Sequence, residues 1–119
     1  MPALNHLIIP AKDKQASAKF LADILGVKVE APWGHFVPVR TSNGVTLDFV
    51  DSKVVRTQHY AFLVDDKEFD AGFAKIKNRG LAFFAHPDKS GLGEINHYWG
   101  GRGVYFEDPN GHVLEILTA

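Results

Sequence analysis

The stretch Gln58-His-Tyr-Ala-Phe-Leu-Val64 decides how the fold is read, because it repeats the design of residues 3–9, Ala-Leu-Asn-His-Leu-Ile-Ile. Both stretches alternate as a strand does and carry one histidine among apolar neighbours, His6 in the first and His59 in the second. An aspartate and then a phenylalanine follow each histidine at the same separation: Asp13 and Phe20, then Asp66 and Phe73. Equal offsets at matching positions indicate a duplicated unit.

A helix is predicted after the first strand of each half. Asp13 can cap the first helix and Gly26 can end it, whereas Asp65 and Glu68 have capping-box spacing in the second, which Gly80 ends. The apolar stripes of the two helices are Phe20, Leu21, Ile24 and Leu25, then Phe69, Phe73 and Ile76. Short apolar segments follow each helix, broken by turn signals at Thr41-Ser-Asn-Gly44 and Asp108-Pro-Asn-Gly111.

The sequence therefore predicts an α+β fold in which a strand, a helix and three strands (βαβββ) occur twice. The first module covers about residues 1–52 and the second about residues 53–119. By its length the chain of 119 residues is expected to be a single domain.

Side chains that can bind a metal share the less apolar face of the predicted strands. Alternation sets His6 with Ile8, His59 with Ala61, and Glu115 with Val113 and Leu117. In the segment 45–50, Asp48 is the corresponding acidic residue. The opposite face of each strand is greasier and should pack on the helices, so two imidazoles and two carboxylates are free to converge on the other face.

Composition excludes several classes of partner and ligand. A net charge of −1 without any Lys/Arg cluster predicts no binding of nucleic acid or of an anionic membrane. Because the chain has no cysteine, a metal must be held by imidazole and carboxylate. No apolar run is long enough for a signal peptide or a membrane span, so the expected location is cytoplasmic.

The closing stretch Gly103-Val-Tyr-Phe-Glu-Asp-Pro-Asn-Gly-His-Val-Leu-Glu115 resembles the vicinal oxygen chelate superfamily, as do Leu4-Asn-His-Leu7 and Gln58-His-Tyr-Ala-Phe62. This group contains glyoxalase I, extradiol dioxygenases, fosfomycin-thiol transferases and bleomycin-resistance proteins. The resemblance implies an open, cup-shaped mixed sheet with helices on its outer face. It also implies a divalent metal that binds a small substrate with adjacent oxygens, and a homodimer in which one site draws its ligands from both chains.

Carried over position by position, the resemblance makes His6, His59 and Glu115 the metal ligands. Asp48 falls where glyoxalase-type members carry a glutamate, and it is one methylene shorter than that pattern. With Asp48 the site would have four protein ligands, as in glyoxalase; without it, the site is the three-ligand facial type used for oxygen activation. Imidazole and carboxylate accept iron, manganese, zinc and nickel alike, so the ligand types do not select the metal. The expected ion is Fe²⁺ or Mn²⁺, with Zn²⁺ or Ni²⁺ as alternatives.

The irregular segment from His86 to Gly103 is predicted to be functional, because it is long, rich in glycine and carries aromatic residues. Within it, His97 is a candidate acid or base, and Trp99 and Arg102 are candidate substrate contacts. Tyr105, in the strand that follows, is a candidate hydrogen-bond donor in the site. Three further histidines beside turns or strand starts are expected to be surface or turn-supporting residues: His35, His86 and His112.

Three functions remain open at this point. The favoured one is a metal-dependent enzyme, either an extradiol-type dioxygenase, placed slightly ahead, or a glyoxalase-type lyase. The second is a bleomycin-resistance-type protein that binds an antibiotic or another aromatic ligand, which Trp33, Tyr98 and Trp99 would suit although that branch generally lacks the metal ligands. The third is fosfomycin-type thiol transfer, which is weakened by Ile8 in place of a threonine and by Gly100-Gly-Arg-Gly103 in place of a serine-rich potassium loop.

Overall fold

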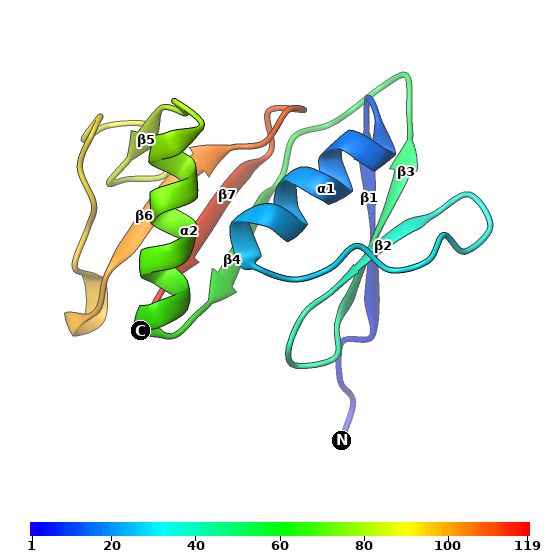
Figure 1. Cartoon of the computed structure of the whole chain (residues 1–119), viewed down its shortest axis with the longest axis horizontal. Coiled ribbons are helices and arrows are strands. Elements are labelled where there is room, and N and C mark those ends of the chain that lie inside the picture. Colours follow the sequence, from blue (N-terminus) through cyan, green and yellow to red (C-terminus); the bar gives the residue numbers. More distant parts are fainter. The chain divides into compact units, whose positions relative to one another are not determined.

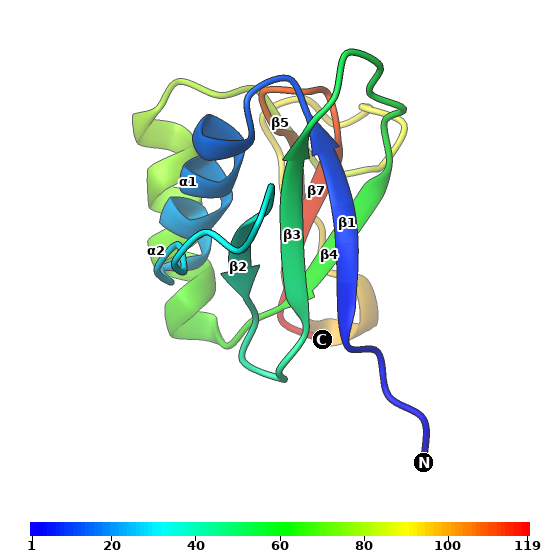
Figure 2. The ribbon, with the colours of Figure 1, turned by 90° about the vertical axis from the view of Figure 1, so that its right-hand side faces the viewer.

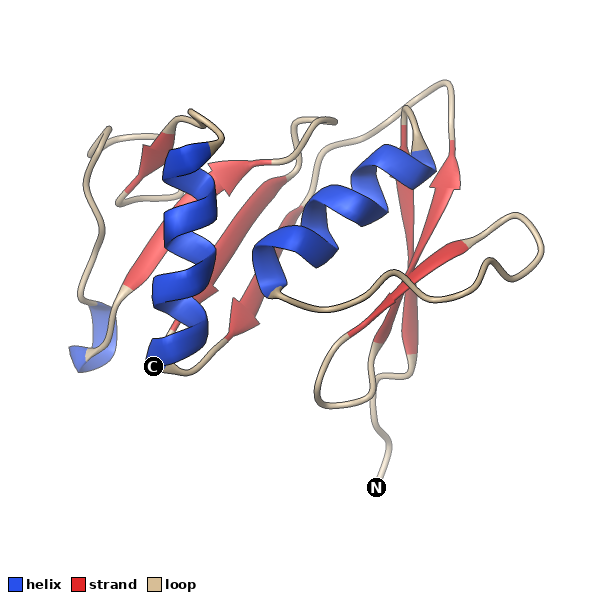
Figure 3. Cartoon of the chain, viewed as in Figure 1, coloured by secondary structure: helices blue, strands red, loops and turns tan.

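Residues 1–119 are all described by a computed structural model, in which the chain forms two units, Met1–Arg56 and Thr57–Ala119 (Figure 1). The first unit contains β1 (His6–Ala11), α1 (Lys14–Leu25), β2 (Val37–Arg40) and β3 (Thr46–Asp51). The second contains β4 (His59–Leu63), α2 (Asp66–Asn78), β5 (Phe83–Phe84), the 3-10 turn η1 (Tyr98–Gly100), β6 (Gly103–Glu107) and β7 (Val113–Leu117), as Figure 3 shows by colour.

Each unit holds one mixed sheet, and the two sheets share a plan. The first has the order β1-β3-β2, with β1 parallel to β3 and β2 antiparallel to β3. The second has the order β4-β7-β6-β5, with β4 parallel to β7 and antiparallel pairs in the rest. In both, the opening strand lies beside the closing one, so the predicted α+β class and the duplicated plan are confirmed.

The predicted βαβββ order is complete in the second unit and reduced in the first. Before β2, the expected strand amounts to a single bridge between Val29 and Val39. The chain leaves the sheet soon afterwards, because Pro32 has no amide hydrogen to donate and Gly34 turns the backbone at φ +58°. The sheet of the first unit therefore has three strands instead of four.

Side-chain caps fix where both helices begin, as predicted. The Asp13 carboxylate accepts hydrogen bonds from the amides of Gln15 and Ala16, both at 3.1 Å, and Gly26 ends α1 at φ +70°. A capping box starts α2: the Asp65 side chain accepts from the Glu68 amide at 2.7 Å, and the Glu68 side chain accepts from the Asp65 amide at 3.0 Å. Such caps satisfy amides that no helical carbonyl can reach.

Each helix covers one face of its own sheet and leaves the other face uncovered by it; Figure 2 shows this for α1. The buried side chains between helix and sheet in the first unit are Phe20, Leu21, Ile24, Ile9, Val37, Val39, Leu47 and Phe49. Those of the second are Phe69, Ile76, Val104, Phe106, Leu114 and Ile116. Burying one such side chain contributes about 1.5–3 kcal/mol, so these faces hold each unit together.

The alternation predicted for the strands is confirmed on the face away from the helix, which we call the open face of each unit. In β1, Ile9 is buried whereas His6 and Ile8 are exposed. In β4, His59 and Ala61 are exposed and alternate with half-buried neighbours. No helix of the chain is both long and apolar enough to cross a membrane.

Candidate metal-binding site

The strand register of the second unit brings three predicted site residues onto one row of the open face. Glu115 on β7 pairs with Ala61 of β4 on one side and with Tyr105 of β6 on the other. His59 lies two residues before Ala61 and therefore points to the same face. The His59 and Tyr105 rings are 5.5 Å apart between centroids, so Glu115 is flanked by an imidazole and a phenol.

Glu115 and His59 meet directly. The distance from Glu115 Oε1 to His59 Nε2 is 3.0 Å, and the side chains are 9% and 45% exposed, respectively. A carboxylate only accepts hydrogen bonds, so His59 Nε2 is the donor. A metal that bound at Nε2 would displace this proton, and the same two atoms would then be available as nitrogen and oxygen ligands.

Tyr105 is the second partner of the Glu115 carboxylate. Burial is the largest cause that raises the pKa of Tyr105 to about 12, followed by the negative charge of Glu115 and the hydrogen bond between the two side chains. The phenol is 6% exposed, so little water reaches it. At neutral pH Tyr105 is therefore a protonated hydrogen-bond donor that holds the carboxylate, and it is not a base.

His6 lies on the open face of the first unit and is oriented by its neighbour. His6 Nδ1 is 2.8 Å from Asn5 Oδ1, which can only accept, so Nδ1 carries the proton. In the neutral imidazole this leaves the lone pair on Nε2 free for a metal, an arrangement common for histidine ligands. Asn5 was not identified from the sequence. The feature that could have pointed to it is its position as a polar residue directly before the first predicted ligand.

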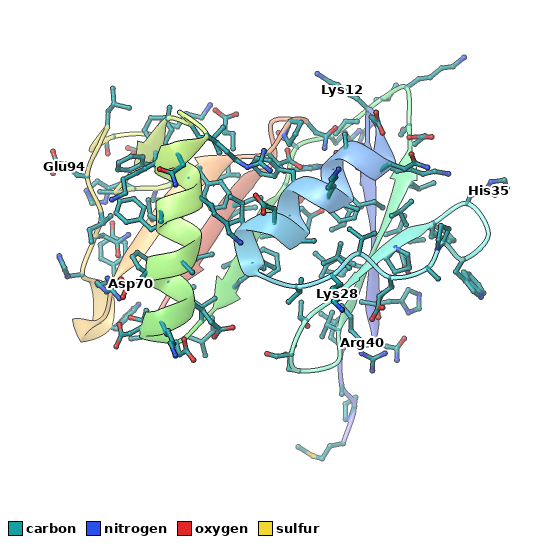
Figure 4. All side chains as sticks on the ribbon, viewed as in Figure 1. Lys12, Lys28, His35, Arg40, Asp70 and Glu94 are labelled. Atoms are coloured by element: carbon teal, nitrogen blue, oxygen red, sulfur yellow. The ribbon has the colours of Figure 1, made fainter.

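Asp48 shares this open face with His6, because Asp48 pairs with Ile8 in the parallel register of β1 and β3. Both line a cavity of about 440 Å³ on the first unit, which Arg40, labelled in Figure 4, also borders. The other lining residues are Asn5, Glu30, Trp33, Pro38 and Thr46. The structure thus places Asp48 with His6 on one face, and Trp33, which is 70% exposed, supplies an aromatic wall.

The two predicted loop residues His97 and Arg102 lie together, at the start of α2 and apart from the Glu115 row. Both line a cavity of about 600 Å³ that Asp66 and Thr118 also border. His97 Nδ1 contacts the Gly101 carbonyl oxygen at 3.2 Å, and no interaction links His97 with Glu115. The roles predicted for these two side chains stay predictions.

The Arg102 side chain forms ion pairs with α2. Its guanidinium donates to Asp70, labelled in Figure 4, at 2.7 Å and to Asp66 at 3.0 Å, and it lies 4.4 Å from the Phe69 ring centroid. Trp99, the other predicted substrate contact, is 87% exposed on η1. Arg102 therefore ties the loop to α2, and Trp99 remains open to solvent.

His86 and Tyr98 are brought together by the structure although sequence reasoning did not pair them. Their side chains form a hydrogen bond, and both belong to the second unit. His86 was expected to be a surface or turn-supporting residue, and no local signal in the sequence pairs it with Tyr98. His112, given the same expectation, is completely buried and accepts the Gln58 amide at 3.0 Å, so it supports the chain from inside.

The three predicted metal ligands are divided between the two units: His6 belongs to the first, and His59 and Glu115 to the second. Neither unit by itself groups three ligand-type side chains around a point where a metal could sit. His59 and Glu115 are the two of these residues that meet within one unit.

The chain belongs to the Glyoxalase/Bleomycin resistance protein/Dioxygenase superfamily, whose model matches residues 3–116. This confirms the resemblance found in the sequence. Its solved structural relatives include two oxidases. Oxidase ChaP-H2 is 55% identical with a TM-score of 0.97, and the match covers 99% of this chain and 94% of that one. Oxidase ChaP-H1 is 53% identical with a TM-score of 0.98, and covers 100% and 97%.

Among curated relatives, the glutathione transferase FosA of Serratia marcescens is 28% identical over 123 residues, covering 98% of this chain and 80% of that protein. A metallothiol transferase FosB of Shouchella clausii is 25% identical over 124 residues, covering 97% and 79%. The chain is therefore similar over nearly its whole length both to oxidases and to transferases of this superfamily.

Proposed function

We propose that this protein is a divalent-metal-dependent oxidase that acts on a small substrate with vicinal oxygen atoms, with chemistry of the extradiol-dioxygenase kind. The observation that carries the proposal is the meeting of His59 and Glu115 on the open face, at 3.0 Å. Identity of 53–55% with two proteins named as oxidases favours oxidation over the lyase alternative.

We assign the metal to His6, His59 and Glu115, because their donor atoms suit it. Two neutral imidazoles and a carboxylate form the ligand set of non-haem Fe²⁺ oxygenases, and they accept Mn²⁺ as well. When bound, such an ion supplies Lewis acidity and, if it is Fe²⁺, reactivity toward dioxygen. Asn5 contributes by holding His6 Nδ1 as a donor, which keeps Nε2 available.

In this proposal Tyr105 supports the ligand Glu115 through a hydrogen bond. Its protonated hydroxyl donates to the Glu115 carboxylate, which fixes the direction of one ligand oxygen. Burial of Tyr105 also excludes water from that side of the carboxylate. A substrate would approach from the exposed side of His59, where the face is open.

Thiol transfer of the fosfomycin type is the second candidate, favoured by the identity of 24–28% with FosA and FosB proteins. Against it, Ile8 stands where that branch carries a threonine, and Gly100-Gly-Arg-Gly103 replaces its serine-rich potassium loop. In the structure Arg102 of this loop forms ion pairs with Asp66 and Asp70, both of which belong to α2.

The test is metal analysis of purified variants after incubation with excess Mn²⁺, followed by oxygen-consumption assays of the Fe²⁺ form with a panel of catechols. Replacing His6, His59 or Glu115 by alanine should abolish metal retention. Asp48→Ala should weaken it by only about 10–100-fold if Asp48 supports the ligands from outside. Affinity should fall as the pH drops through the histidine range, since the imidazoles must be neutral to bind.

His35→Ala is the matched control, because this histidine is exposed and only its backbone carbonyl makes a hydrogen bond, with Lys14. Retention of a full metal complement by His59→Ala or Glu115→Ala would refute the assignment. Turnover of a methylglyoxal–glutathione adduct without oxygen uptake would favour the lyase, and transfer of glutathione to fosfomycin would favour the transferase.

A further inference from the structure

The second unit contains one more pair of ionisable side chains close to Tyr105. Phe84 on β5 is opposite Tyr105 in the antiparallel register, and His86 follows two residues later, beyond the end of the strand. His86 Nδ1 forms a hydrogen bond with the Tyr98 hydroxyl, and the two ring centroids are 5.8 Å apart. An imidazole and a phenol thus meet just beyond the strand that pairs with β6.

Tyr98 lies near enough to Tyr105 to affect it. After burial and Glu115, the electrostatic effect of Tyr98 is the last of the causes that raise the pKa of Tyr105. Tyr98 is 41% exposed, so solvent reaches part of this residue. Neither Tyr98 nor His86 contacts Glu115 or His59 directly, so neither would be a ligand of a bound metal.

The loop is built to hold Tyr98 in place. The buried Asn96 donates from Nδ2 to the Ala85 carbonyl oxygen at 2.7 Å, and its Oδ1 accepts the Tyr98 amide at 3.2 Å. Gly103 makes room for this side chain, because a Cβ there would lie 2.8 Å from Asn96 Oδ1. Asn96 therefore ties the backbone of Tyr98 to the residue directly before His86.

A carboxylate, Asp88, and a cation, Lys89, follow His86 closely in the chain. Asp88, two residues on, interacts electrostatically with His86; its pKa is lowered mainly by hydrogen bonds from Ser90 and to a smaller degree by the charge of His86. The neighbouring cation Lys89 forms an ion pair with Glu107 at 3.0 Å, and this pairing offsets the repulsion between Lys89 and a positively charged His86. A carboxylate is thus close to His86, and the nearby cation has a carboxylate partner of its own.

From this arrangement we infer that Tyr98 and His86 form a proton-transfer pair that deprotonates a substrate hydroxyl at the open face, with Tyr98 as the catalytic residue and His86 as the base behind it. The inference rests on the proposed function, since it requires a substrate with ionisable vicinal oxygens. As the Tyr98 hydroxyl accepts the substrate proton, it passes its own proton to His86 Nδ1. The substrate oxygen becomes an anion, His86 becomes imidazolium, and no electrons are transferred.

The test measures the ionisation of a bound probe, so it does not depend on turnover. Nitrocatechol has vicinal hydroxyls, and its absorption spectrum changes when it loses a proton. It is titrated while bound to the protein loaded with excess Zn²⁺, a metal without redox chemistry. The variants are Tyr98→Phe and His86→Asn, and the control is Tyr60→Phe, which removes a phenol from β4 on the face opposite His59.

In both variants the pH at which half of the bound probe is deprotonated should rise by about one unit or more, a tenfold weaker proton acceptance. Metal content should stay equal to that of the wild-type and Tyr60→Phe proteins. A midpoint that is unchanged in either variant, or that moves equally in Tyr60→Phe, would overturn the inference and leave the proposed function standing. If the Zn²⁺-loaded wild-type protein does not bind the probe, both the proposed function and the inference are wrong.

Discussion

Glu115→Gln should lower the pKa of Tyr105 in the metal-free protein. In the wild-type chain the pKa lies at about 12 instead of 10.0, first because the phenol is buried, and then because the Glu115 charge and hydrogen bond oppose loss of its proton. The substitution removes the charge and weakens the hydrogen bond but leaves the burial. We therefore expect a value between 10.0 and about 12, not a return to the ordinary one.

The same shift sets a pH-dependent part of the stability. One unit of pKa corresponds to about 1.36 kcal/mol, so a rise from 10.0 to about 12 amounts to roughly 2.7 kcal/mol. Below about pH 10 Tyr105 is protonated in both the folded and the unfolded chain, and this contribution is complete. Between about pH 10 and 12 the unfolded chain loses the proton first, so the contribution disappears as the pH rises.

Tyrosinate absorbance measured against pH gives the midpoint, and the difference between the wild-type and Tyr105→Phe curves isolates Tyr105 from Tyr60 and Tyr98. Circular dichroism recorded on the same samples shows the pH range over which the fold persists. Urea unfolding at several pH values then measures the stability term. A Tyr105 midpoint near 10.0 in the wild-type protein, or one that Glu115→Gln leaves in place, would show that the phenol and carboxylate do not interact as described.

Two further outcomes are expected. Asp65→Ala should lower the free energy of unfolding by about 1 kcal/mol, because it removes the capping box of α2. Asp70→Ala should lower it by less, because it removes only a mostly exposed ion pair with Arg102. Chemical denaturation of both variants measures the two losses, and equal losses would contradict this ranking. The resemblance to the superfamily predicts a homodimer in which sites draw His6 from one chain and His59 with Glu115 from the other. Sedimentation should then give twice the chain mass of 13.2 kDa at micromolar concentration, and a monomer with a full metal complement would refute that arrangement.

Local sequence signals were sufficient to predict where the two helices begin and which way the strand side chains point. Asp13 and the Asp65–Glu68 pair begin the helices where their spacing predicts, since capping depends only on residues within one turn. Alternation likewise placed Glu115 and Tyr105 on the open face, because a strand has a fixed period of two residues. The shortened first sheet was not predicted, as Pro32 and Gly34 were not read as ending a strand.

The loop from His86 to Gly103 shows what only the tertiary structure decided. Its composition indicated function and singled out His97, but an irregular segment has no period from which the direction of a side chain can be read. The fold puts His97 beside Gly101 and pairs Tyr98 with His86 through the anchor at Asn96. Likewise, the sequence did not predict the ion pairs that Arg102 forms with Asp66 and Asp70 of α2.

The sequence by itself determined the fold class, the two helices with their caps, and the ligand-type residues His6, His59 and Glu115 on the strand faces, because each follows from spacing along the chain. The tertiary structure decided which of those groups meet. Glu115 meets His59 and Tyr105 because the register of β4, β7 and β6 aligns residues from distant parts of the second unit. Such alignment depends on long-range pairing, which no local spacing encodes.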